Sequence, residues 1–387
     1  MTAKYFENGS FKWGINVDDM WVYAGLPPPV NISRNQVVGK RIEGGLRGVS
    51  HRDIQLWKHS PPPNYEEESP HLVRLGREAV SGLAKEVSAS GIDFVRCWFQ
   101  WNFFQPKMDS FSYRFPLDNF VSTLRAEGIE IIAVLACGYS RFLPIGINED
   151  SPVTYLSTLE KTSREIVNHY SKSIRVWQIE NEPNWWFAHS ASGWRKGTIW
   201  QLPGFEEDVL ALLGRIVREE SPSSLIAINL EADRKRTAWN FYSKFCDAIG
   251  LDFYPNYMKS MPIDVSAYDL STEIRAATGL PCFIAETGYP SGPTYEGFSE
   301  YNQELFIEAA TEKAYSSDAL NGISIWRYSD SDWQSFPKQE NYFGLRHEDR
   351  TPKPGWTKYL RAIKSFKARS ASNRNESREK EEKSISP

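Results

Sequence analysis

From residue 71 onward, short apolar segments alternate with longer segments of helical periodicity, and this alternation restricts the fold more than any other feature of the sequence. The helices are expected at residues 71–90, 115–127, 151–172, 206–220, 237–247, 264–278, 299–316 and 354–367. Together with a first strand at 11–18, the expected strands are 93–99, 129–136, 174–182, 225–230, 249–254, 281–286 and 322–328. Strands that alternate with helices form parallel sheets, and eight such units close into a barrel.

The fold class predicted from this order is α/β, a (β/α)8 TIM barrel in a single domain over residues 1–368. A doubly wound open sheet is the alternative, but no Gly-rich phosphate loop follows any expected strand. Residues 19–70 lack periodicity, and we expect an irregular insertion over the catalytic face or a surface insertion without function. Residues 369–387 are almost entirely polar, which predicts a disordered tail.

The composition fits a large globular protein with a sizeable core. Hydrophobic residues make up 41% of the 387 residues and aromatic residues 14%, and the net charge of −4 gives no indication of nucleic acid or an anionic membrane as a partner. No apolar stretch predicts a membrane span or a signal peptide, so a cytoplasmic location is expected, although a processed secreted protein would look the same. The six His have no paired ligand spacing, and no metal or cofactor is predicted.

Two of the expected strands end in a glutamate. Glu182 ends the strand that begins at Ile174, and Glu286 ends the strand that begins at Pro281, with a turn containing Gly or Pro after each. In a parallel barrel all strand C-termini open on one face, so the two carboxylates can meet there. Glu180 lies two residues before Glu182, and strand periodicity points both to one side; we prefer Glu182 because the strand ends there.

With these strands placed fourth and seventh, the chain resembles the clan A glycoside hydrolases, which are retaining enzymes on a (β/α)8 barrel. Asn181-Glu182-Pro183 resembles the acid/base motif of that clan, and residues 286–291 (Glu-Thr-Gly-Tyr-Pro-Ser) resemble the nucleophile motif. The resemblance extends from about residue 11 to 367. Further matching pieces lie on strands two, three, six and eight: Val95–Trp98, Gly128-Ile129, Phe253–Pro255 and Trp326.

The resemblance implies Glu286 as nucleophile and Glu182 as the acid that later activates water. Arg96 would keep Glu286 ionised, although a purely structural salt bridge in the barrel is the alternative. Asn181 would donate to the sugar 2-hydroxyl, and Tyr254 would hydrogen-bond Glu286.

Aromatic residues complete the expected substrate site. Tyr257 is an alternative to Tyr254 as the partner of Glu286. Trp326 would form the floor of the central subsite, or else simply pack in the core. Trp185 and Trp186 follow the acid on a loop, where we expect a subsite for the leaving group.

The predicted function is that of a retaining β-glycosidase acting on a β-linked oligosaccharide or glycoside. A transglycosylase would use the same residues, and a non-catalytic carbohydrate-binding barrel is the alternative from another class. These motifs do not distinguish the sugar or the oligomeric state. The 19–70 insertion favours trimming of chain ends over internal cleavage, because it would close one side of a cleft.

Overall fold

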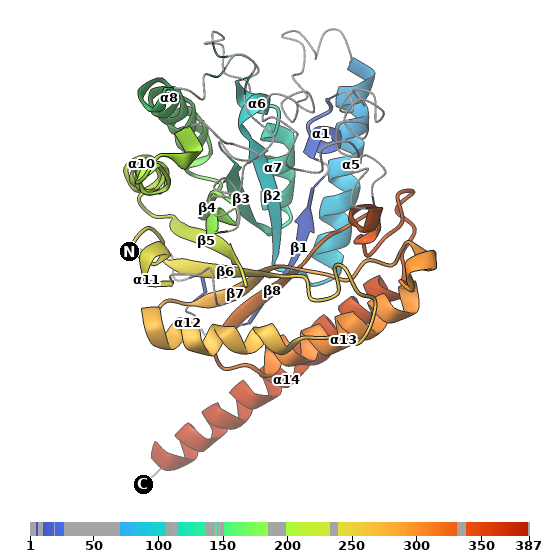
Figure 1. Cartoon of the computed structure of the whole chain (residues 1–387). Coiled ribbons are helices and arrows are strands. Elements are labelled where there is room, and N and C mark those ends of the chain that lie inside the picture. The colour runs from blue at the N-terminus through green and yellow to red at the C-terminus, as the bar shows by residue number, and fades with distance from the viewer. Residues whose placement is uncertain are drawn as a thin grey trace.

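The computed structural model is a closed barrel of eight parallel strands in chain order, with helices around it (Figure 1). It describes residues 5–6, 11–18, 20–26, 70–105, 108, 115–136, 144, 147, 151–184, 199–232, 239–330 and 338–385. The strands are β1 (Lys12–Val17), β2 (Phe94–Gln100), β3 (Glu130–Ala136), β4 (Val176–Ile179), β5 (Leu225–Glu231), β6 (Ala248–Phe253), β7 (Cys282–Thr287) and β8 (Leu320–Ile325). The predicted TIM barrel is confirmed.

The helices between the strands lie near the positions expected from periodicity. The longer helices are α5 (Pro70–Ala89), α7 (Asp118–Ala126), α8 (Pro152–Tyr170), α10 (Phe205–Glu220), α12 (Leu270–Thr278), α13 (Glu300–Ser316) and α14 (Pro354–Ile385). The short ones are α1 (Met20–Tyr23), α6 (Trp101–Phe104), α11 (Trp239–Tyr242) and the 3₁₀ turns η3 (Ile199–Gln201), η4 (Ser266–Asp269), η5 (Thr294–Glu296) and η6 (Lys338–Tyr342). Ser151 caps α8 by accepting a hydrogen bond from the Thr154 amide at 3.3 Å.

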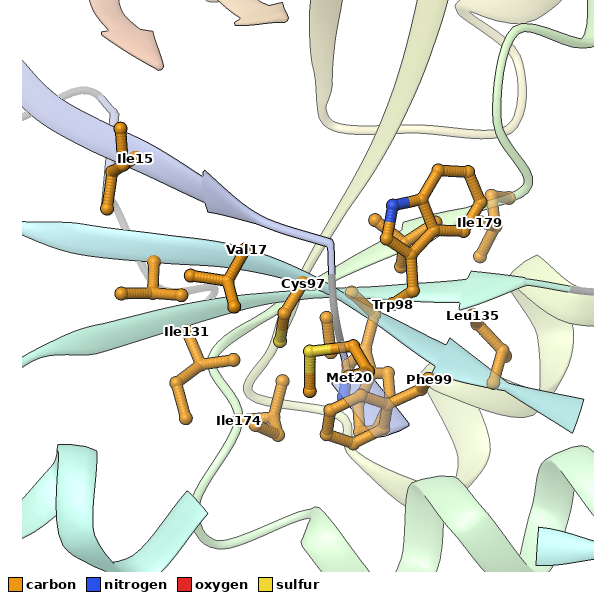
Figure 2. Close-up of a cluster of buried hydrophobic side chains, with 14 of the residues drawn as sticks. Ile15, Val17, Met20, Cys97, Trp98, Phe99, Ile131, Leu135, Ile174 and Ile179 are labelled. Carbon is orange, nitrogen blue, oxygen red and sulfur yellow. The ribbon is translucent and has the colours of Figure 1, made fainter. Parts of the chain in front are cut away.

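One side of each strand packs against the helices. Figure 2 shows this layer for the first strands, where Cys97 lies among apolar side chains that include Val17 and Met20. Cys97 is fully buried, and burial raises the pKa of its thiol, so it is an inert core residue. The outer layer thus stabilises the barrel.

The other side of each strand points into the barrel. Apolar residues close the N-terminal end of the barrel, called its lower end below. Phe6 stacks on Phe283 with ring centroids 4.5 Å apart, and the carbonyl of Phe6 accepts a hydrogen bond from Asn321. Many members of this cluster are the first residues of their strands, which places the cluster at the N-terminal end of the barrel. Its members are Phe6, Phe94, Ile132, Val176, Leu225, Ala227, Ala248, Phe283 and Ala285.

Three segments of the barrel domain differ from the sequence-based expectation. Within 19–70, residues 20–23 form α1, which packs on α5, so this part is not irregular; residues 27–69 lie outside the described residues. The helix expected at 237–247 shortens to α11, and the one expected at 264–278 divides into η4 and α12. Apolar spacing alone misses such breaks because local hydrogen bonding, not the apolar pattern, decides where a helix stops.

Helix α14 continues to Ile385, well past residue 367, where the sequence predicted that helix to end and a disordered tail to begin. Figure 1 shows this helix extending beyond the barrel. A segment rich in Arg, Lys and Glu has high helix propensity even without an apolar stripe, and it continues a helix that the barrel has already nucleated.

Candidate active site

Glu286 reaches the barrel mouth because β7 contains a bulge. On the neighbouring strand, Leu251 pairs with Ile284 but Asp252 pairs with Glu286, so Ala285 is an extra residue on β7. Ala285 belongs to the apolar cluster inside the barrel, and simple alternation would turn the next side chain outward. The bulge restores the inward direction, so Glu286 lies level with Asp252 at the C-terminal face.

The Glu286 carboxylate accepts two short hydrogen bonds. Arg96 on β2 forms an ion pair with Oε1 at 2.5 Å, and the Tyr254 hydroxyl donates to Oε2 at 2.6 Å. Tyr257 donates instead to Glu340, so the structure favours Tyr254 over its rival. Charge-assisted hydrogen bonds of this kind hold a carboxylate in one orientation. The predicted contacts of Arg96 and Tyr254 are both present.

Glu182 lies on a turn just after β4, which ends at Ile179. Glu180 and Glu182 both have left-handed backbone conformations, with φ of 58° and 46°. Strand periodicity therefore does not apply to them, and their spacing of two residues gives no information about which way each side chain points. Non-glycine residues in this conformation cluster at functional sites, where the surrounding structure holds them in place.

Strand β5 holds the turn that carries Glu182. The Glu182 amide donates to Asn229 Oδ1 at 3.1 Å. Asn184 exchanges two hydrogen bonds with the backbone of Glu231: Nδ2 donates to the carbonyl at 2.9 Å, and Oδ1 accepts from the amide at 3.0 Å. The turn is thus fixed on both sides of the glutamate.

Burial raises the pKa of Glu182 well above its ordinary value, and the negative charges of Glu286 and Glu231 raise it further; Arg96 opposes them. Glu182 and Glu286 therefore interact electrostatically. A carboxyl group with a raised pKa next to an ion-paired carboxylate is the arrangement in which one group donates a proton and the other acts as an anion.

Arg96 is the centre of the site and is fully buried. Besides Glu286, its guanidinium donates to Gln178 Oε1, Asn16 Oδ1 and Asn181 Oδ1, each at 2.7 Å. A planar guanidinium with fixed donors orients several acceptors at once. Arg96 therefore links the nucleophile candidate on β7 to the residue that precedes the acid candidate.

Besides Asn16, three residues of this network were not singled out from the sequence. Gln178 Nε2 donates to Asn229 Oδ1 at 2.6 Å, and Asn229 Nδ2 donates to Asn181 Oδ1 at 2.7 Å and to Asp252 Oδ2. A signal was present: each of these three polar residues interrupts an apolar strand on the inward side. A polar residue inside a buried strand needs a partner or a function.

Trp326 follows β8 directly and is 7% exposed, and its amide donates to the Thr287 carbonyl at 2.7 Å. Gly288 packs against it so closely that a Cβ there would lie 2.2 Å from the Trp326 carbonyl oxygen. This close approach explains the glycine two residues after Glu286. Trp185 and Trp186 lie outside the described residues.

Within the described ranges, no cluster of three or more His, Cys, Asp or Glu has a geometry that holds a metal ion. None of the helices in that part of the chain is long and apolar enough to cross a membrane.

Comparisons with known proteins place this barrel beside glycoside hydrolases. No family model and no curated protein matches the sequence. A GH5_18 enzyme from Streptomyces cattleya in complex with GlcNAc superposes with a TM-score of 0.64, at 17% identity and with 75% of each chain covered. The exo-β-1,4-mannosidase Op5Man5 from Opitutaceae bacterium strain TAV5 has a TM-score of 0.59 at 13% identity, over 93% of this chain and 60% of its own.

A family 39 glycoside hydrolase from Bacteroides cellulosilyticus WH2 is also similar, with a TM-score of 0.55 at 14% identity, over 73% of this chain and 60% of that one. At these identities the likeness is one of fold. The molecule has the (β/α)8 barrel fold of these glycoside hydrolases, as the resemblance of the two Glu motifs implies.

Proposed function

We propose that the protein is a retaining β-glycosidase in which Glu286 is the nucleophile and Glu182 the acid/base. One observation carries the proposal: Glu286 is ion-paired with Arg96 and hydrogen-bonded by Tyr254, while burial and the charge of Glu286 raise the pKa of Glu182. The two carboxyl groups thus have the different protonation states that double displacement requires.

In the first step, a Glu286 oxygen forms a bond to the anomeric carbon as the bond to the leaving oxygen breaks. Glu182 transfers its proton to that oxygen, so the leaving group departs as a neutral alcohol. The ester that results has no charge on Glu286, which removes one cause of the raised pKa of Glu182. Glu182, now ionised, takes a proton from water as the water attacks the anomeric carbon and Glu286 is released.

Asn181 is suited to the sugar 2-hydroxyl. Arg96 and Asn229 both donate to Oδ1 of Asn181, which fixes the amide with Nδ2 on the opposite side. A donor held in this way strengthens its hydrogen bond as charge develops on the ring, because no reorganisation is needed. Trp326 remains a proposed floor for this sugar, and Trp185 and Trp186 a proposed leaving-group subsite.

The first sugar to test is a β-mannoside. GH5_18 variants from Streptomyces cattleya and Bifidobacterium longum subsp. longum were crystallised with Manβ1-4GlcNAc, and Op5Man5 is an exo-β-1,4-mannosidase. We also propose that the enzyme trims β-linked chains from one end. Op5Man5 is an exo-acting enzyme, and an insertion at 19–70 would close one side of the cleft. Product analysis on a β-linked oligosaccharide separates this from internal cleavage.

The test is hydrolysis of aryl β-glycosides of six sugars (gluco, galacto, manno, xylo, fuco and glucurono). We expect cleavage of one, lost on the order of 10⁶-fold in Glu286→Ala, as for removal of a catalytic nucleophile in another hydrolase. In Glu182→Ala the loss is about 10²- to 10⁴-fold, and azide restores turnover because it needs no general base. Glu207→Ala, on the outer helix α10, is the matched control and should keep full activity.

The alternatives give different results. A transglycosylase transfers the sugar to an added acceptor sugar faster than to water. A carbohydrate-binding barrel binds an oligosaccharide without turning it over. Azide rescue in Glu286→Ala instead of Glu182→Ala would reverse the two roles.

A further inference from the structure

Asp252 is a second buried acid beside the proposed nucleophile. It lies on β6 in register with Glu286 on β7 and is 1% exposed. Its Oδ2 accepts a hydrogen bond from Asn229 Nδ2, and its Oδ1 has no hydrogen-bond partner among the residues that the structure describes. The mechanism proposed above gives this residue no task.

The surroundings of Asp252 disfavour a negative charge on it. Burial and the charges of Glu286 and Glu182 raise its pKa, while Arg96 and the Asn229 hydrogen bond oppose them; Tyr254 is the other titratable group that faces it. The printed hydrogen bonds of Arg96 go to Gln178, Asn16, Asn181 and Glu286, not to Asp252. A buried carboxylate with a single hydrogen bond from a neutral amide is costly, so the neutral acid is the stable form.

Asn229 connects Asp252 to the reacting groups, and its amide can sit in only one orientation. Its oxygen accepts from Gln178 Nε2 and from the Glu182 amide, and its nitrogen donates to Asn181 and Asp252. A flipped amide would place its donor against the Glu182 amide, which is also a donor. Asp252 stabilises the correct orientation because it supplies an acceptor at the nitrogen end.

We propose that Asp252 is a positioning residue of the glycosidase site, acting as a neutral carboxylic acid that fixes Asn229 and, through it, the backbone of Glu182 and the amide of Asn181. This inference rests on the proposed function for its effect on catalysis. It adds a residue on β6 that touches neither the sugar nor the leaving group.

Asp252→Leu tests the positioning. The variant removes the acceptor that Asp252 offers to Asn229 Nδ2, so Asn229 is held less firmly and, through it, the Glu182 turn. We expect kcat/KM to fall about 10²-fold on an aryl glycoside with a poor leaving group. With a dinitrophenyl leaving group, which departs without a proton, the fall should be less than about tenfold. Asp252→Asn supplies an acceptor oxygen again and should restore activity on both substrates.

Asp247→Leu is the matched control, since Asp247 lies at the opposite end of the same strand. Its Oδ2 accepts from the Ile226 amide at 2.8 Å, so its loss weakens the fold without moving Glu182. We expect equal effects on the two leaving groups in this control. Equal losses on both substrates in Asp252→Leu, with no rescue by Asp252→Asn, would overturn the proposal.

A second measurement does not need activity. In wild type, Asp252 has a higher pKa in the folded protein than in the unfolded chain, where the pKa is about 4. Stability therefore falls as the pH rises above about 4. Asp252→Asn has no such titration. The Tm of this variant minus that of wild type should therefore rise with pH, by roughly 2 °C or more between about pH 4 and 7. A difference that falls with pH would show an ionised Asp252 and overturn the proposal, even if Asp252→Leu does not fold.

The two proposals fail separately. If wild type cleaves no glycoside, the proposed function fails, and the pH dependence of Tm still decides whether Asp252 is neutral.

Discussion

The barrel interior has two layers of side chains, two residues apart on the same strands: a lower, apolar level towards the N-terminal end and an upper, polar level towards the C-terminal end. At the lower level, Phe94, Val176 and Ala227 belong to one apolar cluster. Two residues further along β2, β4 and β5, on the same side of each strand, the upper level has Arg96, Gln178 and Asn229, all fully buried. The backbone is the same at both levels, and only the side-chain chemistry changes.

The difference shows how one barrel separates stability from function. Apolar side chains at the N-terminal end pack by dispersion and the hydrophobic effect, which are not directional. Polar side chains at the C-terminal end are stable in the interior only when every donor meets an acceptor, which imposes directions. The upper level is therefore both an orienting frame for Glu286 and Asn181 and the part that a single substitution disturbs in several places.

The largest effect is expected from Arg96→Leu, which breaks the upper level at its centre. Glu286, Asn181, Gln178 and Asn16 would all lose a donor. Breaking a buried ion pair costs about 3 to 5 kcal/mol of stability, measurable by urea unfolding. In addition, kcat/KM should fall about 10³-fold or more, because both the proposed nucleophile and the proposed 2-hydroxyl donor lose their orientation.

Arg96→Lys is the matched control, because it keeps the charge but lacks the planar fork. Its losses should lie between those of wild type and Arg96→Leu. Activity of Arg96→Leu within tenfold of wild type would show that the ion pair is only a structural element of the barrel.

Phe283→Ala breaks the lower level instead. Phe283 is fully buried and stacks on Phe6, so we expect a loss of about 3 to 5 kcal/mol in the free energy of unfolding, with Phe283→Leu losing less. The kcat/KM of the folded enzyme should be unchanged under conditions where both proteins are folded. A fall in kcat/KM in step with stability would mean that the two levels are not independent.

The sequence predicted the barrel and the two glutamates for physical reasons that act locally. The spacing of apolar residues differs between strands and helices because one side of each element is buried, and this spacing can be read directly from the sequence. Glu182 and Glu286 were visible because charged residues at the ends of apolar strands are rare. Arg96 and Tyr254 needed the resemblance to known enzymes, because their contact with Glu286 joins residues far apart in the chain.

Other features depend on tertiary structure. The bulge at Ala285 is a relation between β6 and β7, and no local pattern shows the extra residue. The intrinsic backbone preference of a glutamate disfavours the left-handed conformation of Glu182. Contacts with Asn229 and Asn184 hold that conformation in the folded structure. Asp252 interrupts an apolar strand, but the strand itself does not show that this acid will lie next to Glu286.

The smallest effect is expected from Glu231→Gln, which tests whether charged side chains near the upper level also adjust the pKa of Glu182. Glu231 raises the pKa of Glu182, after burial and Glu286. In the proposed mechanism Glu182 must be protonated to act as the acid, so kcat/KM is expected to fall as the pH rises through its pKa. Removing the charge of Glu231 lowers that pKa, and the alkaline limb should shift to lower pH by less than about one unit, which corresponds to 1.36 kcal/mol.

The hydrogen bonds between Asn184 and Glu231 use the Glu231 backbone, so the substitution leaves the Glu182 turn in place. Glu340→Gln should give a smaller shift in the same direction, because Glu340 has a weaker effect on the Glu182 pKa, and Glu207→Gln on α10 should give none. A shift to higher pH, or equal shifts in all three variants, would contradict this order. A graded series would show that side chains at the barrel mouth tune the acid by charge alone, separately from the hydrogen bonds that position it.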